Sequence, residues 1–515
     1  MPSRTGLEGP PRPFGAAPPP GHAPPSTAPR LQRAQNHALL YGPFPKSGLL
    51  RGISDSTLVL SKEPAVRALA LSRIRATGAS IVRIPVEWRY VVSVDPSAEF
   101  VASDPASPAY DFASVDAAVR ETVAAGLTPL LVVTRAPAFA QAPNRWPYAY
   151  PGSWAPNPVA FGEFATAVAR RYDGSFPDPE EPGATLPRVR LFEAWNEPNL
   201  ARYLEPQWVA VGGRWRAFAP LLYRQLLNAF YAAVKAVAPT DTVIAAGVAP
   251  NGEPAGVGRM TPLRFLREML CLEGGGREAC SDPPHFDVLA FHPLSFESPD
   301  RAAASSQDVA IADIAKVTAL LAQARRAGTA LPRAHKPLWV TELNWESAPQ
   351  TPHGVPPRLQ ALWISRALHR LWVAGAGLVE WQFLMDPYPN LTLATPTAGT
   401  VQVSRPGGLY SPGPGGSLAT AKPKPFLRGF TLPFDPLRVD RRHVRVWALL
   451  MRPRQPVALQ RLARGGVWRP IAALRANDSA VLNTLLTLRG AAELRIVSGT
   501  LGSASASVGR GRARL

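Results

Sequence analysis

Short apolar runs alternate with longer amphipathic segments along most of the chain. Eight of the runs have the length and composition of strands and lie near Leu49–Ser54, Ile81–Val86, Thr128–Val133, Arg188–Ala194, Thr242–Ala246, Phe286–His292, Pro337–Glu342 and Gly377–Phe383. Helical spacing marks the segments Pro64–Thr77, Phe112–Ala125, Pro158–Tyr172, Leu221–Val237, Gln307–Ala327 and Arg358–Ala374. These βα units predict an α/β fold, the (β/α)8 or TIM barrel. A doubly wound sheet is the weaker alternative, because no glycine-rich phosphate loop follows the first predicted strand.

The pattern changes after the eighth run. Ser404–Pro425 is rich in Gly and Pro and resists the helix that should close a barrel, so we expect Ala421–Phe434 to cross back irregularly. Strand-like runs then follow at Val444–Met451, Val457–Leu462, Trp468–Leu474, Ala480–Leu488 and Glu493–Val497. Gly465-Gly466 predicts a hairpin turn between the second and third of them. The C-terminal part therefore predicts a small all-β sandwich domain.

Four parts follow from these patterns: a disordered Pro-rich leader (1–44), the barrel (45–435), the β-sandwich (436–505) and a basic tail (506–515). The leader has no apolar segment behind a basic start, so it is not an ordinary signal peptide. Export by another route, a true signal upstream of this start, and residence inside the cell all stay open.

Composition allows a large core, since 46% of the 515 residues are hydrophobic and 18% are charged. No uninterrupted apolar run reaches the roughly 18 residues of a membrane span. From Ala421 to Leu515 there are 18 Lys and Arg against 4 Asp and Glu, so this part holds +14 of the net +19. That excess indicates either a solvated Arg-rich surface or attraction to an anionic cell wall or acidic polysaccharide. The sequence contains no RNP, zinc-finger or helix-turn-helix pattern, so nucleic acid is not the expected partner.

The two cysteines, Cys271 and Cys280, flank a Gly-rich loop and have no His at zinc-site spacing. We predict that they form a disulfide, which would contribute about 3 kcal/mol of stability and indicate an oxidising compartment. Two free thiols are the alternative. With the disulfide, the expected location is extracellular or cell-wall associated.

Two of the predicted strands end on glutamates. Arg190–Asn199 runs from apolar residues into Asn196 and Glu197, and Lys336–Trp345 ends its apolar run on Glu342. Catalytic residues of a βα barrel project from the carboxyl ends of its strands, and two carboxyl groups are the equipment for glycoside hydrolysis. Glu197 suits a general acid, and Glu342, 145 residues later, suits a nucleophile. A solvated strand-end carboxylate is the alternative for either glutamate alone.

With these motifs in place, residues 45–400 resemble the clan-A retaining glycoside hydrolases, most similar to the cellulase-like family 5 and the β-xylosidase-like family 39. The resemblance implies an acid/base at Glu197 after Asn196 on strand four, and a nucleophile at Glu342 ending strand seven. It also implies that Arg83, in Val82–Val86 on strand two, holds the nucleophile and keeps it ionised.

The resemblance further implies that His292 on strand six binds at the site and that Trp381 on strand eight forms the floor of the cleaved-sugar subsite. Leu294 stands where clan members often carry a tyrosine, and Arg135 stands near the end of strand three where they often carry a histidine. These departures leave the family and the substrate open. The C-terminal part resembles immunoglobulin-like accessory domains and is expected to be dispensable for chemistry, although its removal could damage folding.

The expected activity is retaining hydrolysis of a β-linked oligo- or polysaccharide, without a metal or other cofactor. A non-catalytic carbohydrate- or cell-wall-binding protein on a barrel scaffold is the alternative from another class. A transglycosylase is a third hypothesis, because it would use the same residues and differ in how well the site excludes water.

Overall fold

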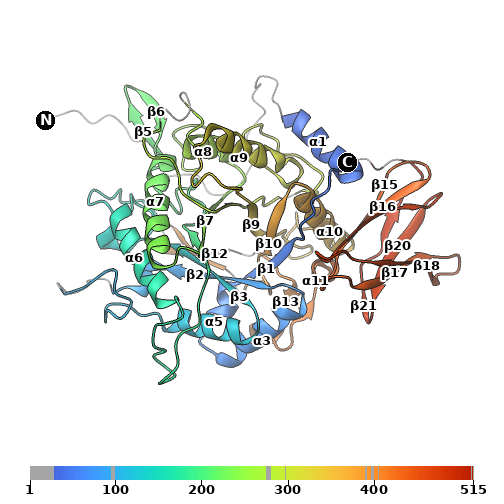
Figure 1. Cartoon of the computed structure of the whole chain (residues 1–515), viewed down its shortest axis with the longest axis horizontal. Coiled ribbons are helices and arrows are strands. Elements are labelled where there is room, and N and C mark those ends of the chain that lie inside the picture. Colours follow the sequence, from blue (N-terminus) through green and yellow to red (C-terminus); the bar gives the residue numbers. More distant parts are fainter. Residues whose placement is uncertain are drawn as a thin grey trace.

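The computed structural model describes residues 28–93, 99–273, 280–295, 297–388, 391–395, 399–403, 405–511 and 513. Within these ranges eight parallel strands form a closed barrel in the order β1-β10-β9-β8-β7-β4-β3-β2 (Figure 1). The strands are β1 (Leu50–Ser54), β2 (Ile81–Glu87), β3 (Thr128–Thr134), β4 (Leu191–Ala194), β7 (Thr242–Val248), β8 (Val288–Phe291), β9 (Leu338–Leu343) and β10 (Ala376–Trp381). The predicted TIM barrel is confirmed, and each strand overlaps the run that predicted it.

Helices surround the barrel at the predicted positions (Figure 1). They are α3 (Pro64–Ala76), α5 (Ala113–Ala124), α6 (Pro158–Arg171), α7 (Ala219–Val237), α9 (Ala315–Ala327) and α10 (Pro357–Val373), with a further helix α8 (Pro262–Met269) after β7. Asn157 begins α6 by accepting hydrogen bonds from the backbone of Val159 and Ala160, and Pro158 occupies the first turn. A small hairpin, β5 (Trp208–Val211) and β6 (Arg214–Ala217), lies between β4 and α7.

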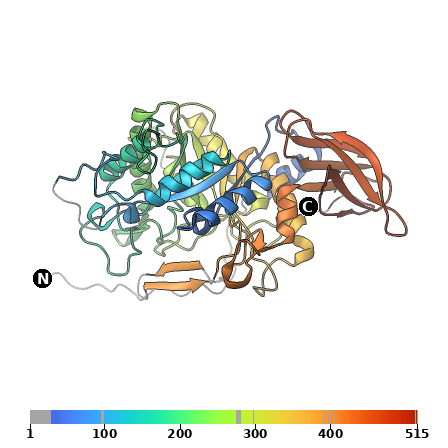
Figure 2. The same cartoon turned by 90° about the horizontal axis from the view of Figure 1, so that it is seen from below.

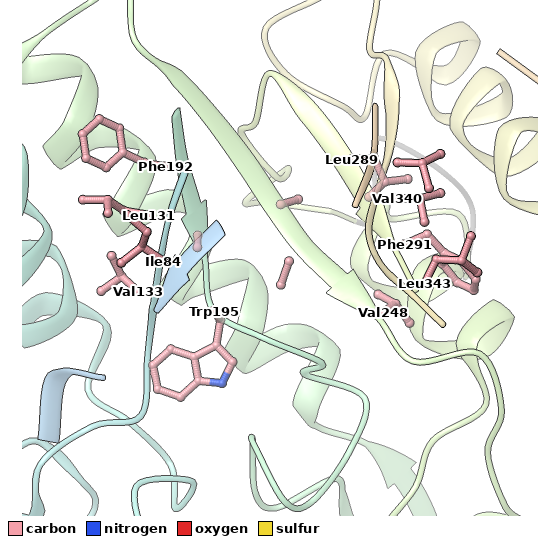
Figure 3. Packing of buried hydrophobic residues seen from close by; sticks show 14 of the residues in the cluster. Ile84, Leu131, Val133, Phe192, Trp195, Val248, Leu289, Phe291, Val340 and Leu343 are labelled. Atoms are coloured by element: carbon pink, nitrogen blue, oxygen red, sulfur yellow. The ribbon is translucent and has the colours of Figure 1, made fainter. Parts of the chain in front are cut away.

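Alternation along the strands separates two apolar layers. Outward side chains of the barrel strands pack beneath the helices as part of the main buried cluster (Figure 3), for example Ile84, Leu131, Phe192, Leu289 and Val340. A separate buried cluster contains the inward side chains near the amino ends of the strands, including Ile81, Leu130, Ile244, Val288 and Leu378. Two residues further along four of the strands, the inward positions are Arg83, Glu193, Thr341 and Glu380, and all four are buried. The strand pattern thus places these four side chains, called the polar ring below, next to a layer of apolar side chains inside the barrel.

One member of this ring, Glu380, is fully buried and has no hydrogen-bond partner among the described residues. Gly52 on the neighbouring strand makes the room, because a Cβ there would lie 2.7 Å from the Glu380 Cγ. Burial raises the pKa of Glu380 well above its usual value. Burial therefore disfavours the charged form of this member of the ring.

The connection after β10 differs from the prediction. The expectation of an irregular crossing over Ala421–Phe434 is wrong for Pro425–Thr431, which form helix α11 packed against α10. Pro425 begins the helix in its first turn, and Phe426 and Phe430 bury their rings against the barrel. Arg51 of β1 donates to the Thr431 carbonyl at 2.9 Å, so a buried cation satisfies the end of this helix. Hairpin β11 (Leu391–Thr395) and β12 (Gly399–Val403) and the short pair β13 (Tyr410–Ser411) and β14 (Lys422–Pro423) precede it.

The predicted disordered leader is partly wrong. Ala28–Tyr41 form helix α1, which packs against α9 and α10, while residues 1–27 lie outside the described residues. Leu39 and Leu40 are buried in a small cluster with Leu437 and Val439 of the C-terminal part. This helix was missed because its apolar partners are remote in sequence and its local composition is dominated by the Pro-rich segment before it.

The C-terminal part is built of two antiparallel sheets that lie at one end of the molecule (Figure 2). One contains β15 (Phe434–Arg438), β16 (His443–Leu449) and β19 (Val481–Thr487), and the other contains β17 (Pro456–Leu462), β18 (Trp468–Arg475), β20 (Ala492–Ser498), β21 (Leu501–Gly502) and β22 (Ala506–Val508). Val444, Val446, Leu459, Leu494 and Ile496 share one buried cluster. The all-β prediction is confirmed, and Gly465-Gly466 connects β17 to β18 with φ values of 88° and 80°.

The predicted divisions at residues 435 and 505 stay predictions. In the structure β15 spans the first of them and β22 lies beyond the second, inside the range expected to be tail. Neither strand was predicted from the sequence, because Phe434–Arg438 contains a proline and Ala506–Val508 is very short.

A buried ion network joins this C-terminal part to the barrel. Asp435 of β15 accepts hydrogen bonds from Arg366 at 2.8 Å and contacts His369 Nδ1 at 2.7 Å, both on α10. Arg366 also pairs with Asp300 at 2.8 Å, in the segment after β8. Burial alone would raise the pKa of Asp435, but Arg366 and His369 hold it at about 2. Trp447 of β16 stacks on His369 with ring centroids 4.7 Å apart, so an aromatic contact accompanies the ion pairs between the sheets and α10.

Cys271 and Cys280 are bonded as predicted, with Cα atoms 5.8 Å apart, at the end of α8. The loop between them, residues 274–279, lies outside the described residues. Among the helices that the structure describes, none is long and apolar enough to cross a membrane.

Replacing Asp435 by Asn should destabilise the whole chain, because Arg366 would keep only Asp300 and His369 would lose its partner. We expect the free energy of unfolding, measured in urea at pH 7, to fall by about 3 kcal/mol. The depressed pKa gives stability that is present above about pH 4 and is lost as the pH falls toward about 2. The loss measured at pH 3 should therefore be smaller than the loss at pH 7. Asp478→Asn, at an exposed ion pair, is the control and should change little; an equal loss at both pH values would contradict this account.

Candidate active site

The two glutamates singled out in the sequence meet at the carboxyl end of the barrel. Glu197 follows β4 and Glu342 lies near the end of β9, and each residue is 8% exposed. One carboxylate oxygen of each, together with a ring nitrogen of His292, lies within 4.8 Å of the others. The structure thus brings together residues that are far apart in the sequence and leaves both carboxyl groups at the edge of solvent.

Arg83 of β2 lies at the centre of this group, 4% exposed. Its guanidinium donates from three nitrogens to three different side chains. Nη1 binds Glu342 Oε1 at 2.7 Å, Nε binds Glu193 Oε2 at 2.7 Å, and Nη2 binds Asn196 Oδ1 at 2.8 Å. A planar guanidinium fixes directions as well as distances, so these bonds determine the orientation of all three partners.

Glu193 was missed as a site residue by the sequence analysis. It is completely buried, and its second oxygen accepts bonds from the Gly247 amide at 3.0 Å and the Thr341 hydroxyl at 3.1 Å. Glu193 therefore supplies the buried charge that offsets Arg83. One signal was available: Glu193 follows Leu191 by two positions, so it shares the inward face of β4, where a charge requires a partner.

His292 connects the two halves of the site. Its Nδ1 lies 3.1 Å from Glu197 Oε1 and its Nε2 lies 3.0 Å from the Thr341 hydroxyl. The imidazole rests on Gly247, where an added Cβ would lie 2.0 Å from Nε2, so only glycine leaves space for the ring. Burial alone would lower the pKa of His292, but the Glu342 charge and the hydrogen bond to Glu197 raise it above 6.5.

The segment around Glu197 is an unusual turn. Trp195 and Glu197 have φ values of 77° and 38°, a left-handed conformation that non-glycine residues rarely adopt. Hydrogen bonds hold it, from the Trp195 amide to the Val133 carbonyl at 2.8 Å and from the Glu197 amide to the Gly247 carbonyl at 3.0 Å. The Trp195 indole also donates to the Tyr203 carbonyl at 2.9 Å. The surrounding structure thus maintains a strained turn that aims Glu197 at the barrel mouth.

The expected role of Trp381 is not supported. Its ring is completely buried, packs against Phe426 of α11 and donates to the Gly407 carbonyl at 2.9 Å. The physical reason is packing, because the rings of Phe426, Phe430 and Trp345 surround that of Trp381. Trp381 is therefore a core residue in this structure and is not kept as a binding residue below.

Arg135, the residue that departs from the histidine of the resembling enzymes, lies just after β3. It has a φ of 60°, lies over the ring of Tyr203 at 4.6 Å, and has Glu87 as its nearest carboxylate at 3.9 Å. Burial raises the pKa of Tyr203, the charges of Arg202 and Arg135 oppose the rise, and those of Glu197 and Glu342 add to it. Tyr203 is therefore a phenol flanked by arginines in the turn that follows Glu197.

Glu197, His292 and Glu342 are also a group of described residues whose atoms converge closely enough to hold a metal ion. The guanidinium of Arg83 already binds Glu342 at 2.7 Å. A metal ion bound there would sit beside this cation, which raises the electrostatic cost of holding it.

No protein-family model matches the sequence, and no curated protein sequence matches it. Solved structures do match the fold. A family 39 glycoside hydrolase from the gut symbiont Bacteroides cellulosilyticus WH2 aligns with a TM-score of 0.51 at 18% sequence identity, over 86% of this chain and 81% of that chain.

A glucosidase from Croceicoccus marinus and a family 39 β-xylosidase from Caulobacter crescentus each align with a TM-score of 0.46, at 13% and 14% identity. They cover 86% of this chain and 95% and 94% of their own chains. The first likeness shows that this chain shares a fold with a glycoside hydrolase. The two weaker ones add no argument.

Gly247 offers a test of the site that needs no substrate. We expect Gly247→Ala to displace the His292 ring, break its bond to Glu197 and lower the free energy of unfolding by about 1–3 kcal/mol. Because Glu342 and Glu197 raise the pKa of His292, the displaced ring should titrate at a lower pH in histidine-labelled NMR spectra. Gly502→Ala is the control, since nothing lies within 4 Å of an added Cβ there. Unchanged stability and an unchanged His292 titration would contradict the geometry.

Proposed function

We propose that the protein is a retaining glycoside hydrolase that cleaves a β-linked oligo- or polysaccharide by double displacement. The observation that supports this most is the pair Glu197 and Glu342, with carboxylate oxygens within 4.8 Å. Retaining enzymes hold their two carboxyl groups about 5–5.5 Å apart, whereas inverting enzymes need roughly 6.5–9.5 Å to admit a water molecule. The shorter spacing leaves the sugar room for direct attack by a carboxylate.

Glu342 is the proposed nucleophile. Its Oε1 is held by Arg83, which leaves Oε2 to attack the anomeric carbon and form a glycosyl-enzyme. The negative charge of Glu342 is held next to a fixed cation inside a protected site, so the surrounding groups reorganise little during the attack. The bond to Glu193 keeps Arg83 from turning away as the charge on Glu342 is consumed.

Glu197 is the proposed acid and base, and a chain of hydrogen bonds connects it to the centre of the site. Glu193 is paired with Arg83 and accepts a hydrogen bond from the Thr341 hydroxyl, so a lone pair of the Thr341 oxygen can accept from His292 Nε2. The other ring nitrogen then shares one proton with Glu197 across 3.1 Å. That proton can pass to the leaving oxygen in the first step and return from water in the second.

Asn196 is proposed to bind the sugar hydroxyl beside the reacting carbon. Its Oδ1 accepts from Arg83 at 2.8 Å, which fixes the amide orientation and presents the NH2 group to the ligand. A donor at this hydroxyl stabilises the oxocarbenium-like transition state. The same arginine therefore positions the nucleophile and the hydroxyl-binding amide together.

We also propose that the protein works outside the cell, which the disulfide supports because such bonds persist in oxidising compartments. The basic C-terminal sheets could attract an anionic cell wall. On this surface Arg461 and Arg469 are partners across β17 and β18, and Arg495 lies over the Trp468 ring at 4.4 Å.

The roles of the two glutamates can be separated by leaving group. We expect Glu342→Gln to lower kcat/KM by about 10⁴-fold or more on every substrate, because no nucleophile remains. We expect Glu197→Ala to lower hydrolysis of poor leaving groups by about 10²–10⁴-fold, while the first step with dinitrophenyl glycosides, which need no proton, is largely spared. Kinetics on a panel of aryl β-glycosides measure both effects.

Azide should partly rescue the Glu197→Ala variant by replacing the water that Glu197 would activate, and the product should be a β-glycosyl azide. Glu346→Gln, a half-buried glutamate four residues beyond Glu342, is the matched control and should keep wild-type rates. An α-configured azide, or equal losses for good and poor leaving groups, would argue against these roles. Absence of turnover across aryl glycosides and polysaccharides would favour the binding-protein alternative.

A further inference from the structure

Arg202 lies in a tightly held turn five residues after Glu197. The Leu200 amide donates to the Glu197 carbonyl at 3.0 Å, and the Tyr203 amide donates to the Leu200 carbonyl at 2.9 Å. The carbonyl of Arg202 itself accepts from Arg135 Nη1 at 3.2 Å. The backbone of Arg202 is therefore fixed to both the acid/base turn and the end of β3.

The guanidinium of Arg202 has no acidic partner in the part of the chain that the structure describes. It makes no ion pair or hydrogen bond there, although Arg202 is half-buried and its Nε is shielded from solvent. The buried arginines Arg83 and Arg171, by contrast, bind the carboxylates of Glu193 and Asp116. The donors of Arg202 are therefore free to bind a ligand that carries negative charge.

The surroundings place this cation on the side of the site that follows Glu197. The Arg202 guanidinium lies 5.8 Å from the ring of Tyr203, and the guanidinium of Arg135 lies 4.6 Å from the same ring. The Tyr203 carbonyl accepts from the indole of Trp195, two residues before Glu197, at 2.9 Å.

Two acids on this side of the site do not pair with Arg202. Burial raises the pKa of Glu205 to about 8, so its carboxyl is mostly protonated at neutral pH. Glu87 is the carboxylate that lies nearest to Arg135, at 3.9 Å. The side of the site formed by Arg135, Arg202 and Tyr203 thus carries positive charge and offers a phenol group that can donate a hydrogen bond.

We propose that Arg202 binds an anionic substituent of the carbohydrate, the carboxylate of a uronic acid or a sulfate ester, on the sugar at or next to the glutamate pair. A guanidinium binds either group through paired hydrogen bonds, and a flanking aromatic ring restrains it in the required plane. The inference rests on the proposed glycosidase function and adds the chemical class of substrate to it.

The test compares substrates that differ in one group. Aryl β-glucosides, β-galactosides and β-mannosides are each compared with the corresponding 6-carboxylate and with the 6-sulfate. A uronic-acid polysaccharide is compared with its carboxyl-reduced form to test a neighbouring sugar. We expect at least one acidic member to exceed its neutral partner in kcat/KM by about tenfold or more, the worth of a charge-assisted hydrogen bond. The pair that responds distinguishes carboxylate from sulfate.

Arg202→Met should remove this preference by lowering kcat/KM for the acidic substrate about tenfold or more while leaving the neutral partner nearly unchanged. Arg202→Lys should retain part of the preference, because it keeps the charge without the paired donors. Arg216→Met, at an exposed arginine in the hairpin between β4 and α7, is the matched control and should keep the wild-type preference.

Neutral substrates that equal or exceed all acidic partners in the wild-type protein would overturn the proposal, as would an equal loss on both members of a pair in Arg202→Met. If no substrate is turned over, the glycosidase proposal fails separately, and calorimetric binding of D-glucuronate, glucose 6-sulfate and D-glucose still tests Arg202. Tighter binding of an anion by the wild-type protein than by Arg202→Met supports the anion site, and equal binding of all three overturns it.

Discussion

The site depends on one guanidinium. Arg83 faces the interior of a barrel whose lower half is apolar, and it binds Glu342, Glu193 and Asn196 through three separate nitrogens. A buried arginine needs its charge and donors satisfied, so the loss of any of these partners is expected to destabilise the fold. In the proposed mechanism the same three bonds fix the nucleophile, the amide that binds the sugar hydroxyl, and the carboxylate that keeps Arg83 in place.

Neighbouring glycines accommodate this arrangement by their small size. Gly247 leaves space for His292, and Gly52 leaves space for Glu380, whose charged form burial disfavours. Arg83 uses its donors on Glu193, Glu342 and Asn196. Away from the polar ring, Asp435 and Arg366 tie the C-terminal sheets to α10, the helix between the nucleophile strand and the last barrel strand. Removing that part would leave buried charges unpaired, although none of the proposed catalytic residues lies in it.

The barrel could be predicted because its strands and helices are encoded locally, by apolar runs such as Ile81–Val86 and by caps such as Asn157. The candidate pair could be predicted because Glu197 and Glu342 end strands. The role of Glu193 was not predicted, because it depends on which face of β4 points into the barrel and on Arg83, a partner 110 residues away. Helix α1 and the burial of Trp381 depend likewise on packing between remote segments, and no local pattern records such contacts.

The central claim is that Glu342 attacks the sugar directly, with Glu197 too close to leave room for an intervening water molecule. Proton NMR of the first product formed from an aryl β-glycoside or β-linked oligosaccharide tests it, because the anomeric signal appears before mutarotation changes it. The arrangement of Glu197, Glu342 and Arg83 predicts that the β-anomer forms first. Initial formation of the α-anomer would show inversion and contradict the double-displacement mechanism.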